Sequence, residues 1–151
     1  MTNATSARRR SAGHPGYDLE RNRVPQVAEE ARALVQTALA AWDLQEHVDA
    51  GELIVSELVA NAIRHASGPT IRIHVDLLTD DRLRFSVVDH APARRPQLRT
   101  PTPDEDSGRG LLLLDVIADR WGYDLVGPAA QPRTKRVWAE VVVAPNVVAK
   151  T

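Results

Sequence analysis

The sequence predicts an α+β fold, a two-layer sandwich in which a mixed, mostly antiparallel sheet carries helices on one face. Two stretches before residue 66 repeat apolar residues at helical spacing. Two stretches between residues 71 and 89, and a last one near residue 140, alternate apolar and polar residues as strands do. The predicted order is helix, helix, strand, strand, loop, helix, strand, strand, which is typical of an antiparallel sheet with segregated helices.

Length and composition restrict the class of protein. The 151 residues correspond to one ordinary domain, and 43% hydrophobic with 26% charged residues is typical of a globular chain. The formal net charge of -1 gives no drive toward nucleic acid or an anionic membrane, and there is no cysteine. No apolar run approaches the ~18 residues needed to cross a bilayer. We therefore expect a cytoplasmic protein without direct nucleic-acid or membrane partners.

The domain boundaries follow from composition. Residues 1–16 are small, polar and basic, so we predict a flexible tail there. The folded domain is expected over residues 17–145, and residues 146–151 form a C-terminal tail. The arginine run 8–10 is interpreted as a solvated charge run, with contact to an acidic partner as the alternative.

Two helices are predicted in the first half of the chain. Pro25 fits the first turn of a helix, and apolar residues recur at helical spacing over residues 27–39. Trp42 is expected to anchor the end of this helix. The second helix is predicted over residues 46–65, because the Ser-Gly-Pro sequence at 67–69 is a stop and turn signal.

A hairpin and a long loop follow. Residues 71–77 and 83–89 alternate apolar and polar side chains around the turn at residues 80–81, which predicts two paired strands. Residues 91–107 are rich in proline and charge and have no periodicity. Loops of this length are usually functional or disordered.

The last third of the chain returns to the sheet. Residues 111–120 are predicted to form an apolar helix, with Gly122 as its C-cap. A short strand is expected over residues 123–126. The alternation over residues 137–143 predicts the last strand.

Polar residues on the second predicted helix suggest a ligand site. At about 100° per residue, Glu57, Asn61 and Arg64 fall on one side, and an apolar face that packs on the sheet falls on the other: Val55, Leu58, Val59 and Ala62. A carboxylate one turn before an amide can accept a proton or orient a hydroxyl, and the amide oxygen can ligate Mg²⁺. The alternatives are a solvated helix face and, for nearby His65, an ordinary helix-end residue.

Two later segments add complementary chemistry. Gly108-Arg109-Gly110 directly precedes the helix predicted from Leu111, and a glycine-bounded helix N-terminus suits phosphate, with Arg109 as a further contact. Asp89, at a strand end, can accept a hydrogen bond from an exocyclic amine such as that of adenine. The alternatives are a flexible loop-to-helix joint and a turn-initiating aspartate.

At these residues the sequence resembles the GHKL (HATPase) superfamily, named for gyrase, Hsp90, histidine kinases and MutL. It is most similar to the stand-alone anti-sigma-factor serine/threonine kinases. Residues 57–66, ELVANAIRHA, resemble the N-box of that branch, and residues 107–111, SGRGL, resemble its second glycine box. Residues 87–89 resemble the strand leading into the first glycine box, and residues 137–139 resemble the last strand. The resemblance covers about residues 24–143.

The resemblance implies a GHKL (Bergerat) ATPase-like fold that binds ATP and Mg²⁺. It implies that Glu57 is the catalytic base, that Asn61 is the Mg²⁺ ligand and that Asp89 binds the adenine amine. Residues 91–107 would be the ATP lid. The remaining nucleotide-binding candidates on this basis are Arg64, His65, Gly108, Arg109, Gly110 and Leu111.

The implied activity is that of an ATP-binding regulatory protein. The γ-phosphate of ATP would pass to a Ser or Thr of a small anti-anti-sigma (STAS-type) protein, and the protein, as a homodimer, would also sequester a sigma factor. The alternative is a non-catalytic module that binds ATP while docking a regulator. A sensor histidine kinase catalytic domain is a third option, but neither His14 nor His47 is placed like a phospho-accepting histidine.

Two positions depart from the family pattern, both on the adenine side. The first glycine box usually carries glycines after its aspartate, but residues 90–93 are HAPA here. Aligning the last strand on residues 137–138 puts Arg136 where many relatives have a threonine that supports adenine, and Thr134 is two residues earlier.

Overall fold

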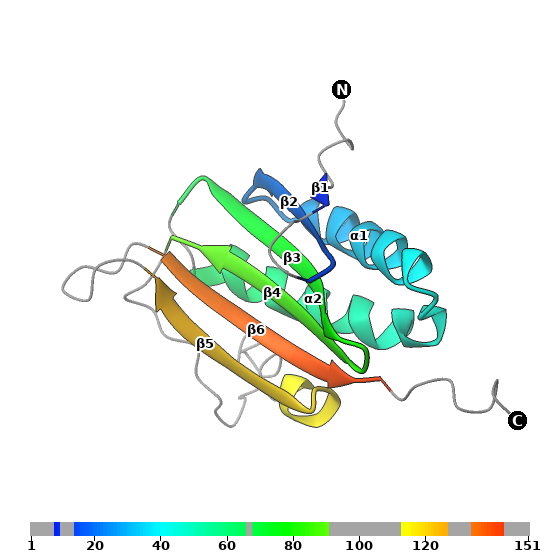
Figure 1. The fold of residues 1–151 in the computed structure, drawn as a ribbon. Helices are drawn as coiled ribbons and strands as arrows, with labels where there is room; N and C mark the ends of the chain where they lie inside the picture. The colour runs from blue at the N-terminus through cyan, green and yellow to red at the C-terminus, as the bar shows by residue number, and fades with distance from the viewer. Residues whose placement is uncertain (1–7, 10–13, 66–67, 91–112, 127–133, 144–151) are drawn as a thin grey trace, which may run out of the picture.

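The computed structural model of the protein describes residues 8–9, 14–65, 68–90, 113–126 and 134–143. The alternating segments belong to one six-stranded antiparallel sheet. The strand order is β1-β2-β3-β4-β6-β5 (Figure 1). The strands are β1 (Arg8–Arg9), β2 (Gly16–Asn22), β3 (Thr70–Thr79), β4 (Arg82–Asp89), β5 (Arg120–Val126) and β6 (Thr134–Val142). Every neighbouring pair in these ranges is antiparallel, so the predicted α+β class is confirmed and the described sheet contains no parallel pair.

Two helices cover one face of the sheet (Figure 1). Helix α1 spans Val27–Ala41 and α2 spans Val48–His65, with the short 3-10 helix η2, Gln45–His47, between them. The helices predicted over residues 27–39 and 46–65 are therefore confirmed, apart from the tighter first turn of the second. Trp42 caps the end of α1, with its ring 5.7 Å from that of Tyr17 on β2.

The hydrophobic core lies between the helix layer and the sheet. The apolar face predicted for α2 is buried there: Val55, Leu58, Val59 and Ala62 are all at most 2% exposed. A Cβ on Gly51 would lie 2.9 Å from Val35 Cγ1 and 3.0 Å from Phe85 Cζ. The absence of a side chain at Gly51 thus lets α2 approach both α1 and β4 closely.

Strand β2 was not predicted, and it begins with Gly16 inside the stretch expected to be a tail. Residues Arg8–Arg9 of that stretch pair with β2 as β1. The reason for the missed strand is local, since only Gly16 and Leu19 of β2 are buried and its sequence lacks an apolar alternation. Its pairing with β3, residue by residue from Gly16↔Asp76 to Asn22↔Thr70, specifies the strand.

The third predicted helix ends earlier than expected. Within the described residues it covers 113–117, and β5 already begins at Arg120. The prediction of Gly122 as a helix C-cap is wrong, because Gly122 lies in β5 opposite Trp138. A Cβ at Gly122 would lie 2.9 Å from Trp138 Cζ2, so the glycine makes room for the indole.

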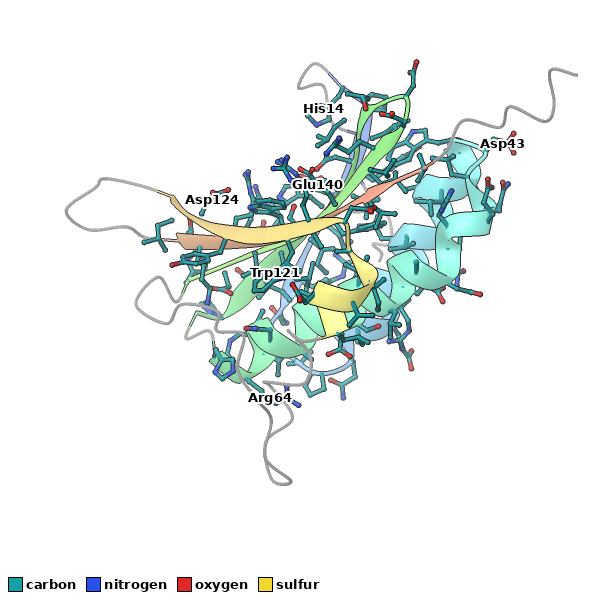
Figure 2. The ribbon with its side chains drawn as sticks, turned by 90° about the horizontal axis from the view of Figure 1, so that it is seen from below. His14, Asp43, Arg64, Trp121, Asp124 and Glu140 are labelled. Atoms are coloured by element: carbon teal, nitrogen blue, oxygen red, sulfur yellow. The ribbon has the colours of Figure 1, made fainter. Side chains whose placement is uncertain are left out.

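The second face of the sheet is free of helices in the described structure. Figure 2 shows Glu140 and Asp124 on this side, which we call the open face, whereas Arg64 lies on the helix side. Of the helices that the structure describes, none is long and apolar enough to cross a membrane.

Candidate functional site

Helix α2 carries the predicted N-box residues, and the structure separates them by burial. Asn61 is only 6% exposed, Glu57 and His65 are half-buried, and Arg64 is exposed near the end of the helix (Figure 2). The alternative of a solvated helix face is therefore wrong for Asn61, whose amide is withdrawn from bulk water. The cost of withdrawing a polar amide from water distinguishes Asn61 from an ordinary surface residue of the helix.

The environment of Glu57 makes its carboxylate a better base. Burial raises the pKa of Glu57, and the positive charge of Arg64 opposes that rise without cancelling it. A carboxylate with a raised pKa accepts a proton more readily at neutral pH. The neighbouring amide of Asn61, one turn further along α2, can provide a hard oxygen ligand.

An arginine that the sequence analysis did not single out fixes the end of this helix. Arg23 donates from Nη1 to the carbonyl of Ile63 at 2.8 Å and from Nε to the carbonyl of Gly68 at 2.7 Å. A cation at a helix C-terminus satisfies carbonyls that have no partner within the helix. Arg23 thereby holds the last turn of α2, which carries Arg64 and directly follows Asn61.

Asp89 ends β4 on the face that is covered by the helices. It continues the inward alternation of Phe85 and Val87, and it is 1% exposed. Strand β3 starts at Thr70, shortly after α2 ends, and pairs antiparallel with β4. The end of β4 therefore lies at the same end of the molecule as the C-terminal half of α2, and the fold brings Asp89 and Asn61 to the same region between the layers.

Lys135 is the cross-strand partner of Asp89 on β6, and the two charges form a buried ion pair. Lys135 Nζ lies 3.8 Å from Asp89 Oδ2, with both side chains 1% exposed. The predicted adenine acceptor thus has a cation beside it. An acceptor next to a donor is the pattern that can read a purine edge, which offers an amine next to a ring nitrogen.

Sequence reasoning missed Lys135, although a signal existed. The inward alternation of the last strand, Val137, Ala139 and Val141, extends back by one step to Lys135. A lysine at an inward position is unusual, because a charged side chain is rarely buried. Where it is buried, it nearly always has a partner of opposite charge. The same alternation places Arg136 and Thr134, which depart from the family pattern, on the open face rather than beside Asp89.

The remaining predicted site residues cannot be placed. Gly108, Arg109, Gly110 and Leu111, and the predicted lid over residues 91–107, lie outside the described residues. Among the residues that are described, no group of three or more His, Cys, Asp or Glu side chains is arranged to hold a metal ion.

The chain belongs to the histidine kinase-like ATPase domain family, whose model matches residues 21–134. It therefore carries an ATP-binding domain of the histidine kinase type, which confirms the GHKL superfamily. The chain is 32% identical over 88 residues to an uncharacterized protein of Streptomyces coelicolor, with 52% of this chain and 84% of that protein covered. It is also similar to the mycobacterial sensor histidine kinase MprB, at 20% identity and a TM-score of 0.47, over 65% of this chain and 73% of that one.

Proposed function

We propose that the protein is an ATP-dependent protein serine/threonine kinase acting in the cytoplasm. The observation that carries the proposal is the pair on α2, in which a half-buried Glu57 with a raised pKa precedes the buried Asn61 by one turn. A general base and a metal ligand on one rigid helix are positioned relative to each other before substrate binds.

The reaction would be a transfer of the γ-phosphoryl group. A serine or threonine hydroxyl of a partner protein attacks the γ-phosphorus, the bond to the β-phosphate oxygen breaks, and ADP leaves. Glu57 orients the hydroxyl and takes its proton. Asn61 would hold Mg²⁺, which neutralises charge on the phosphates, and this neutralisation is the main electrostatic need of phosphoryl transfer.

The partners that we propose follow the resemblance to anti-sigma-factor kinases. The phosphate acceptor would be a small anti-anti-sigma protein of the STAS type, and a sigma factor would be sequestered by a homodimer of this chain. Asp89 and Lys135 would contact the purine, and Arg64 and His65 would lie toward the nucleotide at the end of α2.

A transfer assay with labelled ATP and a candidate acceptor tests the catalytic assignment. Glu57→Gln should lower the transfer rate by about 10²–10⁴-fold, the usual contribution of general base catalysis. Glu52→Gln, on the same helix and hydrogen-bonded to Gln36 of α1, is the matched control and should leave transfer unchanged. Equal rates for wild type and Glu57→Gln would show that Glu57 is not the base.

ATP binding without transfer is the second candidate function, and the two departures from the family pattern on the adenine side, at residues 90–93 and at Arg136, favour it. ATP would then serve as a structural ligand for partner docking. This function predicts ATP-dependent binding of a partner that gains no phosphate. In either case Mg-ATP should raise the melting temperature of wild type, because a ligand of the native state stabilises it, and Asn61→Ala should reduce that rise.

A further inference from the structure

The open face of the sheet contains a hollow that is separate from the site on α2. It has a volume of about 440 Å³, and its polar lining comes from β2, β3, β6 and the residue after β4: Glu20, Thr70, Arg72, His74, His90, Thr134 and Arg136. These residues are far apart in the sequence and meet because β3 pairs with β2 and β4, and β4 pairs with β6.

The floor of the hollow lies between two arginines. Arg72, Val88 and Arg136 form one cross-strand row over β3, β4 and β6. Neighbouring strands are about 4.8 Å apart, so the two arginine Cα atoms are separated by about 10 Å across Val88. Val88 has no polar group, so it leaves space beside Arg136 in which a ligand can lie.

Three arginines of the open face lie beside one buried carboxylate, that of Glu140. Glu140, 2% exposed, pairs with Arg84 at 2.6 Å and with Arg82 at 3.1 Å. Arg120 lies 3.6 Å from the same carboxylate and 5.5 Å from the centre of the Trp138 ring. These cations therefore have acceptors within the protein itself.

Arg136 differs from these arginines. Its Nε is buried, and within the described part of the chain it has no hydrogen-bond partner. In the same hollow, the Glu20 carboxylate is already held by Arg72 at 2.9 Å and by Thr70 at 3.4 Å, and the hydrogen bond from Arg72 lowers the pKa of Glu20 despite partial burial. A buried donor without an acceptor is costly, so an acceptor supplied from outside would relieve that cost.

We propose that this hollow binds a phosphate-bearing ligand, with Arg136 as its anchor. A guanidinium donates in a planar fork that matches phosphate oxygens, and Thr134 and His74 supply further polar groups around the same space. The negative charge of a phosphate matches the cations Arg72 and Arg136, while Glu20 and exposed Asp124, which neighbours Arg136 on β5, favour a single compact anion over a polyanion.

The hollow is independent of the nucleotide site proposed on α2. Val88 and Arg136 face the open side, whereas their chain neighbours Asp89 and Lys135 face the helices, because successive side chains of a strand point to opposite faces. The two sites are thus back to back across one sheet, and each can be removed by mutation without touching a residue of the other.

A titration of the full chain with inorganic phosphate at constant ionic strength tests the proposal. The imidazole NMR signals of His74 and His90 report on the hollow, and that of His47, on η2, is the internal reference. We expect saturable shifts at His74 and His90 in wild type, with affinity at least about tenfold lower in Arg136→Gln, as expected for loss of a charge-assisted hydrogen bond. Arg120→Gln is the matched control on the same face, and Asn61→Ala is the control for the nucleotide site; both should bind phosphate as wild type does.

Several outcomes would overturn the proposal. Unchanged phosphate affinity in Arg136→Gln would remove the anchor, and equal binding of acetate would show a carboxylate site instead. Absence of shifts in wild type, as when a second copy covers this face, would exclude the site. If Arg136→Gln does not fold, Arg136→Lys keeps the charge but not the fork, and full phosphate affinity in that variant would equally refute the role given to the guanidinium.

Discussion

Replacing Lys135 by methionine is expected to destabilise the protein strongly, because the change leaves Asp89 buried without this cation. Methionine keeps most of the length of the lysine stem, so lost packing contributes little. At the observed separation of 3.8 Å and an effective dielectric constant near 20, the pair interacts by about 4 kcal/mol. Removing one partner of a buried pair typically costs about 3–5 kcal/mol, a large part of the ~5–15 kcal/mol that stabilises a domain.

Urea unfolding of four chains measures this interaction: wild type, Lys135→Met, Asp89→Asn and the double variant. The double variant should be more stable than the sum of the two single changes predicts, since it contains neither buried charge. The exposed pair Arg72–Glu20, with side chains 50% and 52% exposed, is the control. Removing this pair by Arg72→Met should lower the free energy of unfolding by less than about 1 kcal/mol.

Additive costs for the two single variants would refute the reasoning, because they would show that the Lys135 and Asp89 charges do not interact. A loss in Lys135→Met no larger than that in Arg72→Met would refute it as well. The slope of unfolding against urea must stay equal among the variants, since a changed slope would report an altered denatured state instead.

Three further predictions concern the helix layer. Gly51→Ala should lower the free energy of unfolding in urea by about 1–3 kcal/mol, because overpacking against Val35 and Phe85 outweighs the gain of ~1 kcal/mol in helix propensity; an increase would show that the layers separate easily. Arg23→Gln should cost about 1–3 kcal/mol by freeing carbonyls at the end of α2, and hydrogen exchange should quicken there first. The pKa of Glu57 is higher in the folded than in the unfolded chain. Protonation of Glu57 therefore contributes stability that is fully present below about pH 4 and is lost as pH rises through the folded-state pKa. Glu57→Gln should therefore be more stable than wild type at pH 7 and equal to it below about pH 4 in thermal melts.

Much of the fold was predictable because its signals are local. The helical spacing of apolar residues in α1 and α2, and the alternation in β3, β4 and β6, reflect which side chains face the core. Strand β2 and the early start of β5 were not predictable in this way. Their residues pair through the backbone with distant strands, and few of their side chains reach the core.

The N-box residues were also predictable from spacing, since a helix places Glu57 and Asn61 one turn apart wherever it lies. Their environments were not. The burial of Asn61, which is 6% exposed, and the raised pKa of Glu57 both depend on what packs against α2.

The sequence by itself determined the α+β class, the two helices, the hairpin and the polar pair on α2, all of which rest on residues close along the chain. Only the tertiary structure decided that Lys135 lies beside Asp89 inside the protein and that Arg136, its neighbour, borders a hollow on the opposite face. Both arrangements join residues more than 40 positions apart through the pairing of β4 with β6. The physical reason is register: a strand alternates its side chains between two faces, and only the pairing with its neighbours specifies which charges meet on each face.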